Sequence, residues 1–202
     1  MGTALNQKTL EAVVAFHGHW CPGLAMGVRL AELALCEVGH CGDEEIVAVA
    51  ESDNCAVDAV QFLTGCTVGK GNLIIRNVGK TAFSFYRRRD GKAVRIVPRP
   101  QPEEQSDAYR VFQVRSNAGT LSDDERRAFA ELRDGRARAL MEADLESLFL
   151  VGPVLFDAPP HAPMEPSRLC EACGEKVMET KMRLHRGRAL CQDCFANRVP
   201  RS

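Results

Sequence analysis

Two histidines and a cysteine occupy alternate positions near the start of this 202-residue chain, at His17, His19 and Cys21. Imidazole nitrogen and thiolate sulfur are both ligands that a borderline-soft transition metal accepts. Pro22 follows directly, and proline favours the first position of a helix, which puts Cys21 at the N-cap, where the helix dipole stabilises a thiolate. The segment therefore predicts a metal-ligating or thiol-reactive site. Taken alone, it also fits a core histidine beside a buried thiol.

Further residues of the same kind follow at the ends of an expected helix over residues 55–64. Cys55 comes at its start, and Asp58 lies three residues on along the same face, close enough to orient a ligand or to move a proton. Cys66 falls in the glycine-rich loop 65–71, with Lys70 four residues later. Two hypotheses stay open: Cys55 and Cys66 join the metal pocket, or one of them is a nucleophile with Asp58 or Lys70 as acid–base partner. Taken singly, either cysteine also fits a small core residue.

The glycine-rich loop does not predict nucleotide hydrolysis. A Walker motif needs four residues between its first glycine and the Gly-Lys pair, followed by serine or threonine, and residues 65–71 lack both features. Backbone amides of such a loop could still cradle an anionic group.

A second cysteine cluster lies near the C-terminus. Cys170 and Cys173 form one Cys-x-x-Cys pair, and Cys191 and Cys194 form another, with seventeen residues between the pairs. Each pair supplies two sulfurs on one side of a tetrahedron, so the spacing predicts a four-thiolate zinc ribbon. About forty residues cannot bury enough surface to fold alone, and zinc would supply most of the stability. From residue 165 the formal charge is +3, and the four-thiolate zinc lowers it to roughly +1. Contact with a protein partner, bracing between the domains or a dimer contact is thus favoured over nucleic acid.

Composition sets the class of protein. The hydrophobic content of 45% suffices for a core, and a net charge of −1 gives no global attraction to nucleic acid or an anionic membrane. No apolar run is long enough to span a bilayer, and the N-terminus has no secretory pattern. Nine cysteines in a reducing compartment indicate metal ligation more than disulfides. We expect a cytoplasmic protein without a membrane partner. Cys36, next to an apolar helix position, is expected to pack in the core.

Hydrophobic periodicity predicts the elements that position these residues. The predicted helices cover residues 10–17, 22–38, 55–64 and 122–148, the last opened by a capping box at Ser122 and Glu125. The predicted strands cover residues 46–50, 73–78, 81–88 and 93–97, with an Asp-Gly hairpin turn between the last two. This order gives an α+β fold, with helices on one side of a mainly antiparallel mixed sheet. We expect a core domain over residues 1–156, a proline-rich linker over 157–166 and the zinc ribbon over 167–202.

Three stretches of the core resemble one known family. They are Phe16-His17-Gly18-His19-x-Cys21-Pro22-Gly23, then the segment from Cys55 through Asp58 and Cys66 to Leu73, then Gly79-Lys80-x-Ala82-Phe83. Together they are similar to the FmdE family, which takes its name from formylmethanofuran dehydrogenase, over about the first 155 residues. Many members also carry a zinc ribbon like the one predicted here.

The resemblance implies a fold related to the second domain of glyceraldehyde phosphate dehydrogenase and a homodimer formed through the sheet. It also implies a core pocket for a transition metal (zinc, nickel or iron) in addition to the ribbon zinc. The pocket residues carried over by motif are His17, His19, Cys21, Cys55 and Cys66, with Asp58 and Lys70 as neighbours.

Three functions follow from these observations. The first is a metal-binding accessory protein with a structural zinc ribbon. The second is a metal- or thiol-dependent enzyme that uses the core pocket, with Cys55, Cys66, Asp58 and Lys70 as the catalytic residues. The third is a regulatory or scaffold protein that contacts protein, or less favourably nucleic acid, through the ribbon.

Overall fold

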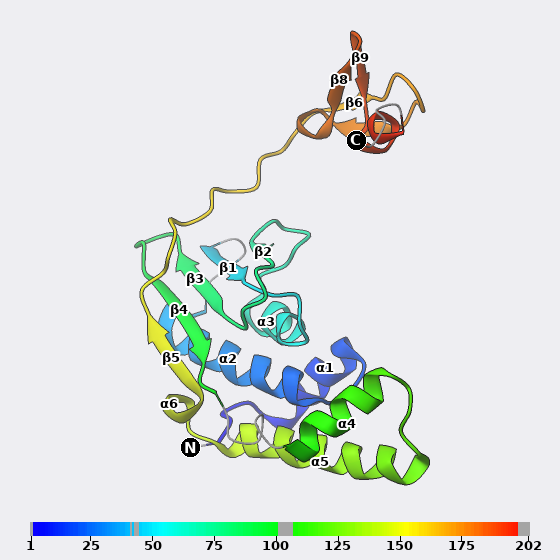
Figure 1. The fold of residues 1–202 in the computed structure, drawn as a ribbon. Coiled ribbons are helices and arrows are strands. Elements are labelled where there is room, and N and C mark those ends of the chain that lie inside the picture. The colour runs from blue at the N-terminus through cyan, green and yellow to red at the C-terminus, as the bar shows by residue number, and fades with distance from the viewer. Residues whose placement is uncertain (1, 41, 43–44, 101–106, 198–202) are drawn as a thin grey trace. The chain divides into compact units, whose positions relative to one another are not determined.

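The computed structural model describes residues 2–40, 42, 45–100 and 107–197 (Figure 1). The chain divides into two compact units, residues 1–161 and residues 162–202. We refer to them as the core unit and the ribbon unit. No helix among the described residues combines the length and the apolar character needed to cross a bilayer.

A five-stranded sheet organises the core unit, in the order β2-β1-β3-β4-β5. Its strands are β1 (Ile46–Ala50), β2 (Leu73–Ile75), β3 (Phe83–Arg87), β4 (Ala93–Pro98) and β5 (Phe149–Gly152). Only the β1–β2 pair among these is parallel, and the other three pairs are antiparallel. The predicted α+β class with a mainly antiparallel mixed sheet is therefore confirmed.

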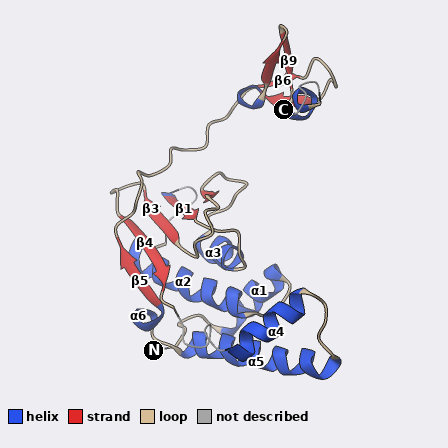
Figure 2. Cartoon of the chain, in the orientation of Figure 1, coloured by secondary structure: helices blue, strands red, loops and turns tan. Residues whose placement is uncertain are grey.

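Helices lie over one face of this sheet (Figure 2). They are α1 (Gln7–His17), α2 (Pro22–Val38), α3 (Ala56–Thr64), α4 (Asp107–Asn117), α5 (Asp123–Glu142) and the single turn α6 (Leu145–Leu148). Phe83, Phe85 and Ile96 point from β3 and β4 into the main core with these helices, as their alternation predicted. The helical layer thus shields the sheet face that carries the largest apolar side chains.

Helix α2 is the centre of the core unit, buried on nearly every side. It is buried this completely because it packs against both α3 and α5. Its buried Arg29 guanidinium donates to Glu32 Oε2 at 2.6 Å and to the Ala143 carbonyl oxygen at 2.6 Å. The second contact lies where α5 ends, and Ala143 is extended there. The predicted helix over 122–148 is therefore interrupted: α5 stops at Glu142, and the separate turn α6 covers Leu145–Leu148.

The opposite sheet face carries a smaller cluster of Val47, Val49 and Tyr86. Residues 153–160, which we call the covering segment, lie over it. The Tyr86 hydroxyl donates to the Phe156 carbonyl at 3.0 Å, and the Arg76 guanidinium stacks 3.9 Å from the centroid of the Phe156 ring. The Arg88 guanidinium donates to the Pro159 carbonyl oxygen. Through these contacts the covering segment belongs to the core unit, which ends at residue 161.

The ribbon unit consists of two short hairpins and one helix. Its elements are β6 (Ser167–Leu169), β7 (Lys176–Met178), η3 (Glu179–Lys181), β8 (Arg183–His185), β9 (Arg188–Leu190) and α7 (Gln192–Ala196). Gly187, with φ of +79°, makes the tight turn between β8 and β9 that the sequence predicted. The buried residues described in this unit are only Cys170, Leu190 and Cys191, so its apolar core is very small.

Candidate metal centre and adjoining cavity

The donor atoms of His17, His19 and Cys21 all lie within 4.8 Å of one another. His17 is the last residue of α1, and Gly18 reverses the chain with a φ of +93° that favours glycine. Cys21 is the N-cap of α2, as Pro22 predicted, and its Sγ accepts the Leu24 amide at 3.3 Å. The junction between two helices therefore places both imidazoles beside a buried sulfur.

Asp58 on α3 fixes the orientation of His17. Its Oδ2 lies 2.7 Å from His17 Nδ1, while His17 Nε2 lies 3.9 Å from Cys21 Sγ. Because the carboxylate can only accept, Nδ1 carries the proton and the Nε2 lone pair faces the sulfur. This carboxylate–histidine arrangement is the one that commonly supports a metal-ligating imidazole.

Cys55 lies beside Cys21 because two glycines let α2 and α3 approach closely. A Cβ placed on Gly23 would be 3.6 Å from Cys55 Sγ and 3.9 Å from Cys21 Sγ, so both sulfurs border this glycine. A Cβ on Gly27 would come within 2.5 Å of the Ala56 Cα, a separation that real structures do not show. Burial, followed by the neighbouring Cys21, raises the pKa of Cys55. Without a metal, burial therefore disfavours the thiolate form of this residue.

The structure places Cys66 and Lys70 apart from this group. Cys66 is fully buried, and its thiol donates to the Ile46 carbonyl oxygen at 3.4 Å. The same oxygen accepts from Asn72 Nδ2, so Cys66 belongs to the packing between the loop and β1. Burial raises the pKa of Cys66 by more than the nearby Lys70 lowers it. Among the described residues, neither Cys55 nor Cys66 belongs to the group of core donors that all lie within 4.8 Å of one another.

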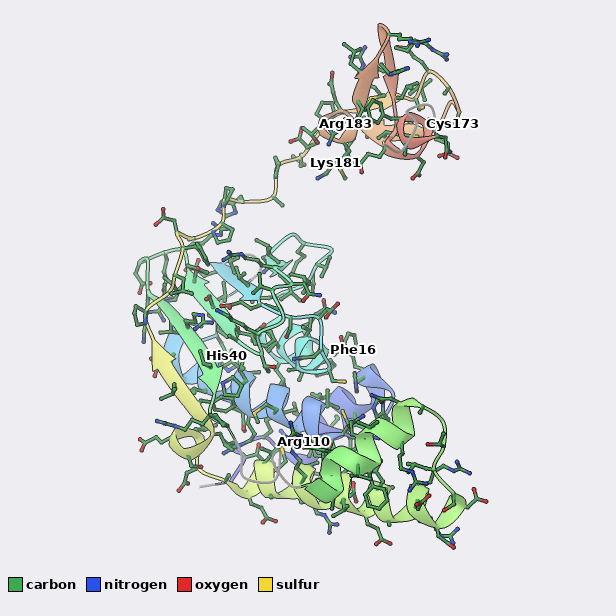
Figure 3. All side chains as sticks on the ribbon, in the orientation of Figure 1. Phe16, His40, Arg110, Cys173, Lys181 and Arg183 are labelled. Atoms are coloured by element: carbon green, nitrogen blue, oxygen red, sulfur yellow. The ribbon has the colours of Figure 1, made fainter. Side chains whose placement is uncertain are left out.

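An aromatic pair lies at the α1–α3 side of the site. Phe16, labelled in Figure 3, directly precedes His17, and its ring centroid lies 5.7 Å from that of Phe62 on α3. Both rings are partly exposed. They add an apolar contact between the two helices that carry His17 and Asp58.

A cavity of about 780 Å³ opens next to the two sulfurs. Cys21 and Cys55 line one end, at the starts of α2 and α3, while β4, α4 and α5 supply the rest of the wall. Its charged lining residues are Lys80, Arg95, Arg99, Arg133 and Arg136. The sequence did not predict this group, because its members come from three separate segments and α4 itself was not predicted. The only available signal was the spacing of Arg133 and Arg136, one helical turn apart.

The ribbon unit holds the second donor group, with the sulfurs of Cys170, Cys173, Cys191 and Cys194 within 4.8 Å of one another. Cys173 (labelled in Figure 3) has its Sγ 4.0 Å from Cys191 Sγ, close to the about 3.8 Å expected for two thiolates on one tetrahedral zinc. Hydrogen bonds from backbone amides, foremost that of Cys173, lower the pKa of Cys170 to about 6. The donor set therefore fits a structural zinc ion.

Comparisons with known proteins identify the family and the fold. The family model described as FmdE, Molybdenum formylmethanofuran dehydrogenase operon, matches residues 16–150. A protein of Archaeoglobus fulgidus described as a probable S-adenosyl-L-methionine-binding protein is 32% identical over 177 residues, which cover 83% of this chain. The match covers 48% of that relative, so the chain spans about half of its length.

A solved structure shares the fold. It is a tungsten formylmethanofuran dehydrogenase FmdE-like protein from Syntrophus aciditrophicus, with a TM-score of 0.59 and 24% sequence identity. The superposition covers 95% of this chain and 92% of that one. The family match spans the helices and the sheet that build the candidate metal centre, and the chain belongs to the FmdE family.

Proposed function

We propose that this chain is a metal-binding accessory protein whose core centre holds one transition-metal ion. The ligands are His17, His19 and Cys21, and Cys55 is the fourth. The observation that carries the proposal is the convergence of three donor atoms within 4.8 Å, with His17 already oriented by Asp58. An ordinary core histidine would not need a second imidazole and a sulfur facing its free nitrogen.

The donor set fits the proposed ion. The 3.9 Å between His17 Nε2 and Cys21 Sγ is slightly longer than the about 3.6 Å that separates a nitrogen and a sulfur ligand on one zinc. Mixed imidazole and thiolate ligands suit zinc, nickel or iron. A metal held there would supply a Lewis acid next to the cavity. Cys55 must lose its proton on binding, so binding weakens as the pH falls.

Elemental analysis of purified full-length protein tests the proposal. We expect two metal ions per chain, one in the core and one in the ribbon, and one ion after Cys21→Ser with Cys55→Ser. Cys170→Ser with Cys173→Ser should also leave one ion, by emptying the other site. Cys36→Ser is the matched control, because Cys36 is an exposed thiol on α2 that should not affect metal content. An unchanged count in the Cys21/Cys55 variant would disprove the core site.

The cavity favours a second candidate, a metal-dependent enzyme, because it opens on two of the four proposed ligands. In an enzyme one coordination position stays open for the substrate, whereas a binding protein can close all four. X-ray absorption at the metal edge of the ribbon-inactivated protein distinguishes them. Two sulfur and two nitrogen neighbours support the accessory protein, and an added light-atom ligand from solvent supports the enzyme.

S-adenosyl-L-methionine, in the description of the Archaeoglobus fulgidus relative, is a poor match for this cavity. The molecule carries a sulfonium and an ammonium group against one carboxylate, and the described cavity wall holds five cations and no carboxylate. We expect calorimetry to detect no binding of this compound at millimolar concentration. Binding that is lost on mutation of the cavity wall would show that charge does not govern this site.

For partners, we propose a homodimer formed through the edge strand β5. Leu150 and Val151 on this strand are each 47% exposed, and the far edge of β5 has no paired strand among the described residues. Light scattering should give twice the chain mass, and Leu150→Glu with Val151→Glu should give the monomer. A monomeric wild-type protein would rule the dimer out.

The ribbon unit is proposed to contact a protein. Leu169, Met178 and Leu184 on its strands are all more than half exposed, and such apolar side chains suit a protein surface better than a phosphate backbone. Electrophoretic mobility of DNA or RNA at low salt should be unchanged by the full-length protein. A shift that disappears without residues 162–202 would support nucleic acid instead.

A further inference from the structure

All the charged residues described in the wall of the cavity beside Cys21 and Cys55 are positive. Its cations are Lys80, Arg95, Arg99, Arg133 and Arg136, and no aspartate or glutamate of the described residues lines it. Arg95 is compensated, since Nε and Nη2 donate to the buried Glu51 carboxylate at 2.6 and 2.9 Å. The lining side chains still carry a net positive charge, although the net charge of the whole chain is −1.

The starts of two helices add to this field. Cys21, Pro22 and Gly23 open the 17-residue α2, and Cys55 and Ala56 open the nine-residue α3, all of them at the cavity wall. The N-terminus of a helix carries roughly half a positive charge. Helix dipoles and side-chain cations therefore act in the same direction at the sulfur end of the cavity.

Two guanidinium groups are held in place against aromatic rings. The Arg133 guanidinium lies 5.8 Å from the Phe129 ring centroid, and that of Arg136 lies 5.0 Å from the Tyr109 ring centroid. The two rings pack edge to face with centroids 5.4 Å apart. The planar guanidinium fork matches the geometry of carboxylate and phosphate groups, and a neighbouring aromatic ring restricts the positions that the fork can take. The rings also give the wall a flat apolar surface.

We propose that the cavity binds an organic anion that carries two or more acidic groups and a planar ring. The acidic groups pair with the arginines of α5, and the ring lies against the aromatic wall. The volume of about 780 Å³ suits a cofactor-sized molecule. One end of such a molecule reaches Cys21 and Cys55, and thus the proposed metal. The anion site itself rests on the cavity and requires no metal.

Calorimetric titration of the full-length protein tests this inference with four probes. Magnesium-free ATP presents phosphates and a ring, benzene-1,3,5-tricarboxylate presents carboxylates and a ring, tripolyphosphate lacks the ring, and adenosine lacks the charge. We expect saturable binding of at least one of the first two, tighter than that of tripolyphosphate or adenosine. Tighter binding of ATP would identify the acidic groups of the ligand as phosphates. Tighter binding of the tricarboxylate would identify them as carboxylates.

Two double variants on the same helix provide the comparison. Arg133→Met with Arg136→Met removes two cavity cations and should weaken binding at least about tenfold, which is about 1.4 kcal/mol. Arg127→Met with Arg138→Met makes the same chemical change at side chains that are about 70% exposed, and should leave binding within twofold. Thermal unfolding of both variants verifies that each is folded.

Three outcomes would overturn the inference. They are no saturable binding of either ring-bearing anion, equal weakening in the two double variants, and adenosine binding as tightly as ATP. Glu103 and Glu104, which fall outside the described residues, are present in the titrated chain, so any charge they contribute is included. Titrating both metal-loaded and chelator-treated protein separates this inference from the proposed function. If the protein binds the anion but no core metal, only the proposed anion site is supported. If it binds a core metal but no anion, only the proposed metal centre is supported.

Discussion

At the scale of single residues, the contact between Asp58 and His17 links the core fold to the proposed metal chemistry. The 2.7 Å contact joins the first turn of α3 to the last residue of α1, and it selects the imidazole nitrogen that faces Cys21. The Asp58 side chain is 43% exposed, so its value to stability is small. Its expected role is to orient His17.

Substituting Asp58 by asparagine therefore tests the orientation of His17 without a large effect on the stability of the fold. We expect a 10–100-fold loss of core-metal affinity, about the usual effect of removing a partner that supports a ligand, with little change in the unfolding temperature. Competition with a chromophoric chelator measures the affinity. Asp53→Asn, an exposed aspartate five residues earlier, is the control and should bind metal like the wild type. Equal affinity in both variants would contradict the orienting role.

How far the sequence predicts the site depends on the distance along the chain between its residues. His17, His19 and Cys21 lie within five residues, and a helix end and a proline fix their relations, so local rules suffice. The sequence also suggests that Cys66 joins them, because it follows α3, but the loop after α3 folds onto β1 instead. That turn depends on Asn72, whose side chain bonds to both Thr67 N and the Ile46 carbonyl, and no local pattern predicts such a contact.

At the scale of the elements, Gly27 sets the distance between α2 and α3. A methyl group there would meet the Cα and carbonyl oxygen of Ala56 at 2.5 and 2.7 Å, and neither backbone atom can rotate away. Cys55 directly precedes Ala56, so any displacement of α3 also moves the fourth proposed metal ligand.

Two opposite effects determine how Gly27→Ala changes the stability of the protein. Alanine gains about 1 kcal/mol of helix propensity, while overpacking of a tight core costs about 1–3 kcal/mol or more. Because only backbone atoms lie in the way, we expect the clash to dominate, with a net loss of about 1–2 kcal/mol in urea unfolding and weaker core-metal binding. Gly135→Ala on α5, where a Cβ meets nothing within 4 Å, should be stabilising. Stabilisation of both variants would show that α2 and α3 can separate without cost.

The start of α5 gives the clearest dependence of stability on pH. The capping box predicted from Ser122 and Glu125 is confirmed, and a hydrogen bond from Arg115 lowers the pKa of Glu125 to about 2. A carboxyl whose pKa falls on folding stabilises the protein above its unfolded pKa, and this contribution is lost as the pH drops from about 4.5 towards 2. We expect Glu125→Gln to lower stability at neutral pH and to reduce the loss between those pH values. Glu131→Gln, on the same helix, should change neither in acid-unfolding curves.

The elements that the sequence missed share a physical cause. The amphipathic pattern continues past Glu142, but α5 ends there, and the Ala143 carbonyl accepts a hydrogen bond from the distant Arg29. Helix α4 follows a proline-rich stretch, and two of its apolar residues, Val111 and Val114, are exposed, so its face towards α5 carries a weak pattern. The prediction that Cys36 packs in the core is wrong, because α2 turns that position towards solvent. Local signals predicted where elements begin better than where they end.

At the scale of the whole molecule, the two units depend on different forces. The core unit buries a sheet face and a central helix, whereas the ribbon unit buries little apart from Leu190 and two of its cysteines. A unit with so small a core takes its folding free energy from the metal.

Removing zinc should therefore unfold one unit and spare the other. After treatment with a strong chelator, hydrogen–deuterium exchange should show loss of protection over residues 167–197 and retention over β1, β3 and β4. The variant Cys170→Ser with Cys173→Ser should give the same pattern without chelator. Persistent protection of the ribbon unit in zinc-free protein would show that packing suffices to fold it.

The covering segment has a consequence for where this chain can be divided. Residues 153–160 are the only layer described over Val47, Val49 and Tyr86, and they precede the ribbon directly. Proteolytic cleavage after residue 161 leaves that layer in place, so the released N-terminal fragment should stay monodisperse. Cleavage at residue 152 would uncover an apolar sheet face next to edge strands, and the fragment should self-associate. A chain that loses or exchanges its ribbon unit during evolution should therefore keep residues 153–160 and change only after them.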